Sequence, residues 1–358
     1  MRLDERGRRA SEELRRTLGW ADEPDAVAID RFEHTRRLRR RNQRIGAAAL
    51  GSIVALAAVA LAIRALAPVP PHEPLAPRSG RLIYGAWDQQ IQQAEWFVAQ
   101  ADGSRSRALG ITATCAVWFP DDARILITND AALGLGSPLR PAIVRADGTG
   151  LLPLVATEND ELNLGCGDVS PDGRRIALEG FGQTDGSLNG IYSVRASDGG
   201  GLVRLVEGPA SPPEYSPDGS RLLFFDTKPG VSPQGAGALF VMGSDGTGVT
   251  RITPWGFAFM DHAWSPDGAW IVFQRPYGEM YLVRPDGADL HRLPVRLPGG
   301  AGAQNPAWSP DGTEIVFSLQ RSDRAELWVV RPNGSGLRKL LGTGAEQLQT
   351  PDWSVSTG

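Results

Sequence analysis

A four-residue phrase, Ser-Pro-Asp-Gly, recurs along this chain at nearly constant spacing. It occupies residues 170–173, 216–219, 265–268 and 309–312, so that its aspartates are 46, 49 and 44 residues apart. A period of 40 to 50 residues is typical of β-propellers, in which each repeat forms one blade. Proline, aspartate and glycine favour tight turns, and apolar runs flank each copy, so each copy predicts a β-hairpin. The phrase therefore predicts an all-β propeller.

Other positions of the repeat give the number of blades. A large apolar residue, here called the slot residue, stands just before each turn and in two degenerate copies: Trp118, Val169, Tyr215, Trp264, Trp308 and Trp353. A second turn, Asp-Gly or Asn-Gly, also occurs six times: 102–103, 147–148, 198–199, 245–246, 286–287 and 333–334. Apolar runs before and after both turns predict four strands in each repeat. We therefore expect six four-stranded blades.

The first blade lacks its innermost strand at the start of the repeat region. Residues 350–355 carry the matching Pro-Asp-Trp-Ser at the other end of that region. Pairing of these residues with the first blade would close the ring and leave only short, protected sheet edges. We therefore expect that removal of the residues after Gly344 opens the ring.

The sequence from about residue 80 to residue 358 resembles the TolB-like β-propeller repeat. The features that carry this resemblance are the slot aromatic, the Ser-Pro-Asp-Gly turn, an apolar strand and an Asp-Gly turn. The repeat is also WD-like, but no Trp-Asp ends the third strand. The resemblance implies a six-bladed propeller that serves protein–protein contacts in the bacterial envelope. It is unspecific for activity, because propellers carry many functions.

The residues before the propeller predict a membrane anchor. Residues 1–44 hold 13 arginines against nine acidic residues, and residues 45–63 carry no charge. We expect a cytoplasmic tail (1–44), a transmembrane helix (45–67), a proline-rich linker (68–79) and an extracytoplasmic propeller (80–358). A cleaved signal peptide is the alternative, although 44 residues before its apolar core would be unusual.

The tail leaves a second function open. Two short helices before a membrane span resemble the cytoplasmic end of some bacterial anti-sigma factors, although no zinc motif is present. On that hypothesis the chain is a transmembrane sensor, and residues 1–44 recruit a cytoplasmic regulator. Nucleic-acid binding is disfavoured, because the arginine cluster adjoins the predicted span. The strong preference for arginine over lysine indicates a high-GC genome such as that of an actinobacterium.

The order of strands places both kinds of turn at one end of the ring and the variable loops at the other. In repeat folds the end that carries insertions is often the binding surface. Candidate partner-binding aromatics in these loops are Trp255, Phe257, Phe259 and Tyr277. The alternative is that they fold inward and plug the ring.

Several polar residues lie within four positions before a slot residue, and we expect them at the channel mouth: Asp168, Glu214, Asp261, His262, Asn305 and Asp352. They could bind a cation or a polar ligand, or simply cap turns at a solvated rim. No metal site is assigned from the sequence, because its four histidines are scattered.

The only two cysteines, Cys115 and Cys166, lie three residues before the slot in adjacent blades. An exported domain permits a disulfide. Inner strands of neighbouring blades can be nearly 10 Å apart, whereas a disulfide needs Cα atoms within about 7 Å. The sequence leaves this bond open.

No catalytic motif stands out. The sequence has no Gly-x-Ser-x-Gly elbow, Walker loop or dinucleotide fingerprint, so we expect neither catalytic residues nor a cofactor. A hydrolase or lyase that uses the channel mouth is the remaining enzymatic alternative. The favoured prediction is non-catalytic binding of an envelope protein or peptide.

Overall fold

The computed structural model describes the propeller region with gaps. The described residues are 80–88, 93–128, 139–154, 159–184, 186–208, 211–227, 237–275, 278–321, 324–342 and 348–354. The predicted tail, membrane span and linker lie outside them, so those three predictions stay predictions. Within the described ranges, no helix is long and apolar enough to cross a membrane.

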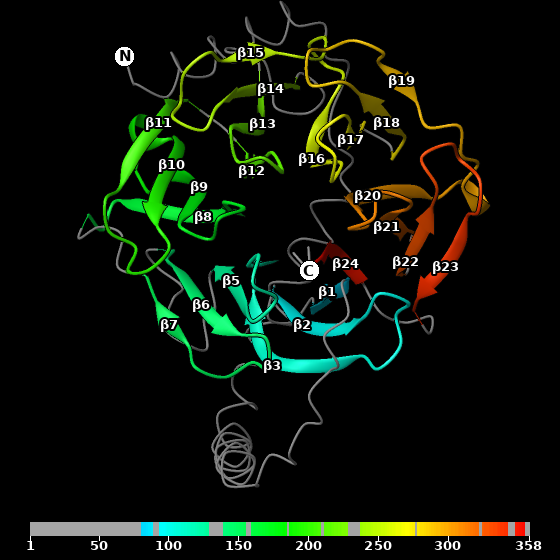
Figure 1. Ribbon diagram of the computed structural model, residues 1–358, viewed down its shortest axis with the longest axis horizontal. Coiled ribbons are helices and arrows are strands. Elements are labelled where there is room, and N and C mark those ends of the chain that lie inside the picture. The colour runs from blue at the N-terminus through cyan, green and yellow to red at the C-terminus, as the bar shows by residue number, and fades with distance from the viewer. Residues whose placement is uncertain are drawn as a thin grey trace, which may run out of the picture. The chain divides into compact units, whose positions relative to one another are not determined.

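The described residues form six antiparallel sheets of four strands arranged in a ring (Figure 1). From the innermost strand outward, blade 1 contains β24 (Leu348–Trp353), β1 (Arg81–Asp88), β2 (Gln93–Gln100) and β3 (Arg107–Ala113). Blade 2 contains β4 (Cys115–Trp118), β5 (Arg124–Thr128), β6 (Pro141–Arg145) and β7 (Leu152–Pro153). Blade 3 contains β8 (Leu162–Val169), β9 (Arg175–Gly182), β10 (Gly190–Arg195) and β11 (Val203–Glu207).

The remaining three blades follow the same order. Blade 4 contains β12 (Glu214–Tyr215), β13 (Arg221–Thr227), β14 (Gly237–Gly243) and β15 (Thr250–Arg251). Blade 5 contains β16 (Phe259–Trp264), β17 (Ile271–Gln274), β18 (Met280–Val283) and β19 (His291–Arg292). Blade 6 contains β20 (Gly302–Trp308), β21 (Ile315–Gln320), β22 (Ala325–Val330) and β23 (Arg338–Leu341). The predicted six-bladed, all-β fold is confirmed.

Each Ser-Pro-Asp-Gly phrase closes the hairpin between the two innermost strands of a blade. In blade 3, Ser170 Oγ donates to Asp172 Oδ1 at 2.7 Å and accepts the backbone N–H of Arg175 at 2.9 Å. Gly173 has φ of 68°, which a residue without Cβ adopts readily. The serine-to-aspartate bond recurs at 2.6 Å in blades 4, 5 and 6, so the phrase is a structural requirement of the turn.

The ring closes through its C-terminal strand, as predicted. β24 pairs antiparallel with β1, with Trp353 opposite Leu82. Ser354 N donates to the Arg81 carbonyl at 2.8 Å, and Arg81 N donates to Ser354 Oγ at 2.9 Å. Blade 1 therefore contains both ends of the propeller region, and its sheet locks the ring.

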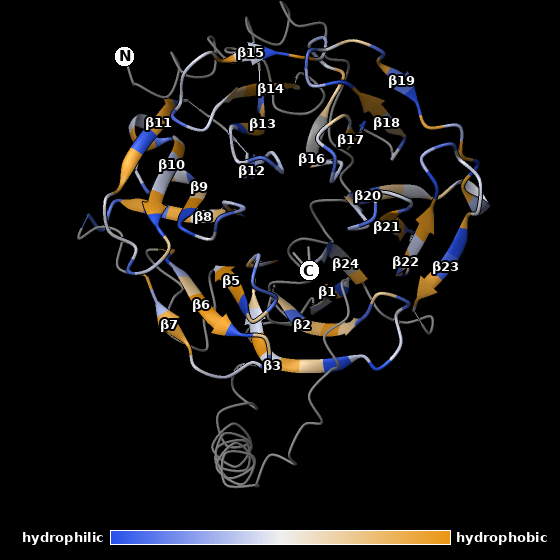
Figure 2. Cartoon of the chain, in the orientation of Figure 1, coloured by the Kyte–Doolittle hydropathy of each residue, from blue (hydrophilic) through white to orange (hydrophobic). Residues whose placement is uncertain are grey.

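The hydrophobic core lies between adjacent blades rather than inside any one of them. The second strands of the blades are almost completely buried, as in β5 and β17, whereas the outermost strand β19 is exposed and hydrophilic (Figure 2). Slot tryptophans pack across these interfaces: the guanidinium carbons of Arg81 and Arg221 lie 4.6 and 5.0 Å above the rings of Trp118 and Trp264 in the next blade. Such stacking contributes about 0.5–1 kcal/mol per pair at accessible sites.

The two ends of the ring differ in construction. The turn end carries the Ser-Pro-Asp-Gly and Asp-Gly turns, and the loop end carries the connections between the second and third strands and between successive blades. Gly80, where the described chain begins, would place a Cβ 3.7 Å from the turn proline Pro310. The chain therefore enters the propeller at its turn end.

Candidate functional site: the central channel

A cavity of about 480 Å³ occupies the centre of the ring and touches the innermost strand of every blade. Its wall begins three or four residues before the slot and ends at the turn prolines, which are Pro120, Pro171, Pro217, Pro266 and Pro310. The cavity therefore fills the turn-end half of the channel. The sequence interpretation missed these prolines as lining residues, although their fixed distance from the slot could have placed them at the inner edge.

Three carboxylates in this wall each bind the backbone of the next blade. Asp352 Oδ2 accepts the N–H of Trp118 at 3.1 Å, and Asp168 Oδ2 accepts the N–H of Tyr215 at 2.8 Å. Glu214 Oε1 accepts the N–H of Trp264 at 2.9 Å. Each carboxylate stands one residue before its own slot, so these three bonds form one repeated contact between neighbouring blades, here called the carboxylate latch.

Burial raises the pKa of all three latch carboxylates. Removal from bulk water raises the pKa of Asp168 to about 7 and that of Asp352 to about 6. The pKa of Glu214 is raised well above its usual range by burial and then by the negative charges of Asp168 and Asp352. The backbone N–H donors oppose these shifts but do not cancel them. Asp168 is therefore partly protonated near neutral pH.

Two further predicted residues meet one layer deeper, toward the loop end. Asp261 accepts a hydrogen bond from the backbone of Asn305 in blade 6, and its Oδ2 accepts Gln274 Nε2 at 2.8 Å. Burial raises the pKa of Asp261 to about 6. His262 also lines the cavity. The structure thus brings all six predicted polar residues to the channel wall. No group of three His, Cys, Asp or Glu among the described residues is arranged to hold a metal ion.

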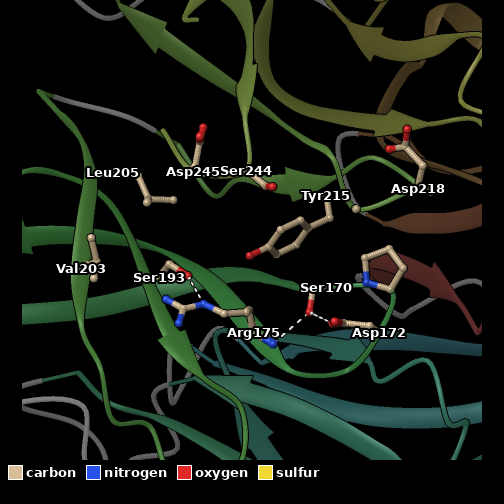
Figure 3. A pocket seen from close by; sticks show the side chains of 12 residues that line it. Ser170, Asp172, Arg175, Ser193, Val203, Leu205, Tyr215, Asp218, Ser244 and Asp245 are labelled. Carbon is tan, nitrogen blue, oxygen red and sulfur yellow. Dashed lines mark hydrogen bonds between the residues drawn. The ribbon is translucent and has the colours of Figure 1, made fainter. Parts of the chain in front are cut away.

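A second cavity, of about 780 Å³, lies at the turn end between blades 3 and 4 (Figure 3). Arg175, Ser193 and Tyr215 line its inner part, and turn residues of both blades form its rim. The sequence interpretation did not find this cavity. The only signal was that Tyr215 replaces the tryptophan found at four of the six slots.

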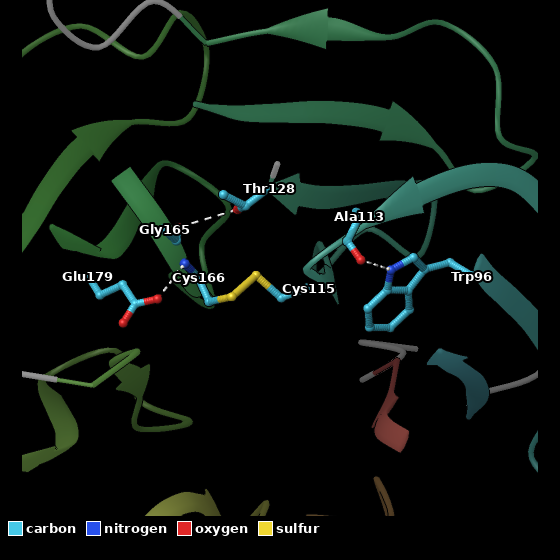
Figure 4. The surroundings of a disulfide bond; sticks show 7 residues. All are labelled: Trp96, Ala113, Cys115, Thr128, Gly165, Cys166 and Glu179. Atoms are coloured by element: carbon cyan, nitrogen blue, oxygen red, sulfur yellow. Dashed lines mark hydrogen bonds between the residues drawn. A yellow bond between two sulfur atoms is a disulfide. The ribbon is translucent and has the colours of Figure 1, made fainter. Parts of the chain in front are cut away.

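A disulfide joins Cys115 of β4 to Cys166 of β8, with Cα atoms 5.9 Å apart (Figure 4). The two inner strands are therefore closer than the nearly 10 Å considered from the sequence. Beside the bond, Glu179 Oε1 accepts the backbone N–H of Cys166 at 3.1 Å, and burial raises the pKa of Glu179 to about 7. The bond links blades 2 and 3, between which no carboxylate latch is present in the described residues.

The predicted aromatics at the loop end pack against the blades. The Phe257 ring meets the rings of Tyr281 and Phe273 at 5.0 and 6.4 Å, and the Trp255 ring meets that of Phe240 at 5.6 Å. Both side chains are half-buried, and neither lines the channel cavity. The side chains of Phe259 and Tyr277 lie outside the described residues. The loop is therefore fixed to blades 4 and 5 by its aromatic side chains.

Comparison with solved structures shows the same fold. TolB from Acinetobacter baumannii is 20% identical with a TM-score of 0.59, and the match covers 77% of this chain and 66% of that one. The putative TolB from Agrobacterium tumefaciens is 18% identical with a TM-score of 0.55, covering 75% and 92%. A puromycin hydrolase mutant complexed with PGG is 16% identical with a TM-score of 0.52, covering 76% and 46%.

These likenesses include both TolB proteins and an enzyme, so they identify the fold and leave the activity open. No curated protein matches the sequence. The sequence does match the TolB beta propeller domain over residues 155–357, which is more than half of its length. Together with the six closed blades, this match shows that the chain belongs to the TolB beta propeller domain family.

Proposed function

We propose that this chain is a membrane-anchored, extracytoplasmic binding protein without catalytic activity. Its propeller holds a segment of an envelope protein or peptide at the turn end of the channel. The observation that carries this proposal is the channel cavity, about 480 Å³ in size, to which every blade contributes. Concave sites of this size, with apolar walls and few polar groups, are typical of ligand recognition.

The walls of the cavity suit an extended chain segment. Slot tryptophans and turn prolines provide apolar surface around the opening, and aromatic residues dominate the binding energy of many protein interfaces. The latch carboxylates add a ring of hydrogen-bonding groups inside. A peptide with an apolar or basic end therefore matches the cavity better than an acidic one.

The hydrogen bonding of the carboxylates supports a non-catalytic role. Each latch carboxylate already accepts a backbone N–H from the neighbouring blade, so part of its bonding capacity holds the ring together. A general acid or base needs a site for the reacting proton within hydrogen-bond reach, and here the blade interface occupies that position. Burial at the blade interface therefore accounts for the raised pKa values without a reaction.

The disulfide supports a place outside the cytoplasm. Disulfides persist in oxidising compartments and are rare in reducing ones. The Cys115–Cys166 bond links two blades at the channel wall, where it constrains the ring. Together with the arginine-rich tail and the uncharged segment 45–63, it favours a propeller displayed beyond the membrane.

The entry point of the chain bears on the direction of binding. Gly80 lies beside Pro310 at the turn end, so a tether from residues 45–67 would join the propeller there. On this proposal the turn end faces the membrane and the partner segment is membrane-proximal. The sequence interpretation favoured the loop end, and the position of the channel cavity is the reason for choosing the turn end instead.

Crosslinking of the full-length chain in its source cells tests the proposal. We expect one dominant envelope protein to copurify with the chain. Ala307→Arg, which places a long side chain in the cavity wall, should abolish that product, whereas Gln304→Arg, at an exposed position of the same strand, should not. Equal recovery with both variants, or no dominant partner, would contradict channel binding.

A further inference from the structure

The second cavity, between blades 3 and 4, is lined by Arg175, Ser193 and Tyr215 on its inner side. It opens at the turn end, and its volume of about 780 Å³ lies within the range of small-molecule sites. The six blades are repeats of one unit, so each position in this cavity can be compared with five equivalents in the same molecule.

Two substitutions in the repeat make this interface hollow and polar. The slot residue of blade 4 is Tyr215, where four blades have tryptophan. Ser193 stands on the third strand of blade 3, opposite Ala177, and the other blades have aliphatic residues on the same rung: Val98, Ile143, Val241, Leu282 and Val329. Tyr215 and Ser193 are thus smaller than the tryptophan and aliphatic side chains at the equivalent positions of most other blades, and they leave space at this interface.

The inner wall of the cavity presents convergent hydrogen-bond donors (Figure 3). Arg175 Nε donates to Ser193 Oγ at 2.9 Å, which fixes the plane of the guanidinium group. The Tyr215 hydroxyl also hydrogen-bonds to the Ser193 side chain. Ser193 and Tyr215 are only 2% and 7% exposed. Both terminal nitrogens of Arg175 lack a hydrogen-bond partner among the described residues, so the outward edge of the guanidinium fork is available.

The rim of the cavity has the opposite charge. Asp172, Asp218 and Asp245 stand in the turns of the two blades, and each uses Oδ1 to hold its own turn. Hydrogen bonds from Ser216 and Ser220 lower the pKa of Asp218 to about 2, and similar bonds lower those of Asp172 and Asp245. All three carboxylates are therefore ionised at neutral pH. One half-buried cation, Arg175, therefore faces three anions at the entrance.

We propose that this interblade pocket binds a small carboxylate that also carries a positive charge, as an amino acid or the C-terminal residue of a peptide does. The guanidinium fork of Arg175 matches a carboxylate in bidentate geometry. The rim aspartates attract an ammonium or guanidinium group and repel ligands with several negative charges, which disfavours phosphates. This site is separate from the proposed channel function and stands or falls independently of it.

Calorimetric titration of the full-length chain in detergent tests the ligand chemistry. The probes are the tripeptide Gly-Gly-Lys, its C-terminal amide and free lysine. We expect the tripeptide to bind at least about tenfold more tightly than the amide, because the amide loses the charge-assisted bonds to Arg175. Comparable binding of free lysine would assign the pocket to amino acids, and binding of the tripeptide alone would assign it to chain termini. Equal binding of acid and amide, or no binding at millimolar concentration, would overturn the proposal.

Variants that restore the consensus of the repeat locate the site. Ser193→Val and Tyr215→Trp introduce residues that the other blades already accommodate, so both should remain folded. Each should weaken tripeptide binding about tenfold or more, as should Arg175→Gln. Arg221→Gln changes the equivalent arginine of the next blade and is the matched control, with unchanged affinity expected. Wild-type affinity in Ser193→Val, or an equal loss in Arg221→Gln, would show that the ligand does not bind here.

Discussion

The turn end and the loop end of the propeller contrast in sequence and in surface. The turn end repeats the same serine–aspartate bonds in four blades, yet both cavities described above are lined by its residues. The loop end varies in sequence, yet its described aromatics pack against blades 4 and 5. Uniform turns therefore do not make an inert surface, because the spaces between the turns are shaped by the residues behind them.

Deletion of residues 345–358 should have the largest effect on stability. The innermost strand β24 runs from the loop end to the turn end of the ring, so its loss affects both ends. The deletion removes the inner strand of blade 1, leaves β1 as an exposed edge and uncovers the core around Leu82. We expect loss of cooperative folding, since the penalty is comparable with the roughly 5–15 kcal/mol stability of a whole domain. Circular dichroism during thermal unfolding measures this. A truncated chain with an unchanged melting temperature would refute the closure.

Loss of the disulfide should have the next largest effect on stability. The bond lies in the channel wall, nearer the loop end than the latch carboxylates. The bond closes a loop of 51 residues, so its removal should lower the free energy of unfolding by about 2–4 kcal/mol. Urea unfolding of the wild type with and without reductant gives this difference. The double variant Cys115→Ala/Cys166→Ala is the control and should be insensitive to reductant. A reductant effect of similar size in that variant would mean that another site is responsible.

The latch carboxylates, in the turn-end half of the channel, should make the free energy of unfolding depend on pH. The folded-state pKa values of Asp168 and Asp352 are raised, so the native state binds protons more tightly than the unfolded state. Their stabilising contribution is full below about pH 4 and is lost as pH rises through 6 to 7. The turn aspartates have lowered pKa values, so their contribution is lost only as pH falls below about 4.

We therefore expect the wild type to be less stable at pH 8 than at pH 5. Asp168→Asn keeps an acceptor for the Tyr215 N–H but removes the titration, and should reduce this difference by an amount on the order of 1–2 kcal/mol. Urea midpoints at the two pH values provide the measurement. Identical pH dependence in wild type and variant would show that the latch does not titrate in this range.

Trp255→Ala should have the smallest effect and probes the loop end. It removes one edge-to-face contact with Phe240 and the stacking of Arg251, together worth about 0.5–1.5 kcal/mol of stability. The recovery of the envelope partner should not change. Copurification after crosslinking, with unfolding measured alongside, checks both parts. Loss of the partner in a folded Trp255→Ala protein would instead place binding at the loop end.

The sequence predicted the architecture because the residues that each turn of the repeat requires are close together in the chain. The turn needs Ser, Pro, Asp and Gly at fixed places, and the unmatched copy at residues 351–354 revealed the closing strand. The spacing before the slot also placed the polar residues on the channel wall. These inferences needed only the register of one strand, which a regular repeat supplies.

The interactions between blades could not be predicted in the same way. The three carboxylate latches join residues 47, 50 and 234 positions apart, and they depend on how neighbouring blades are oriented. The Cys115–Cys166 distance depends on the same geometry. The cavity beside Tyr215 results from missing volume at Ser193, which becomes visible only when the rung of the sheet is known. The sequence showed that the loop between blades 4 and 5 is rich in aromatic residues. It did not show that Trp255 and Phe257 pack against the blades.

Site-specific photocrosslinking tests the choice of the turn end most directly. A photoreactive residue would replace Arg174, in the turn of blade 3, or Glu161, beside the loop-end start of β8 in the same blade. Both positions are exposed, so the two full-length probes differ mainly in the end that they sample. In source cells, the Arg174 probe should form one dominant adduct with an envelope protein and the Glu161 probe should not. An adduct from Glu161 alone would contradict binding at the turn end.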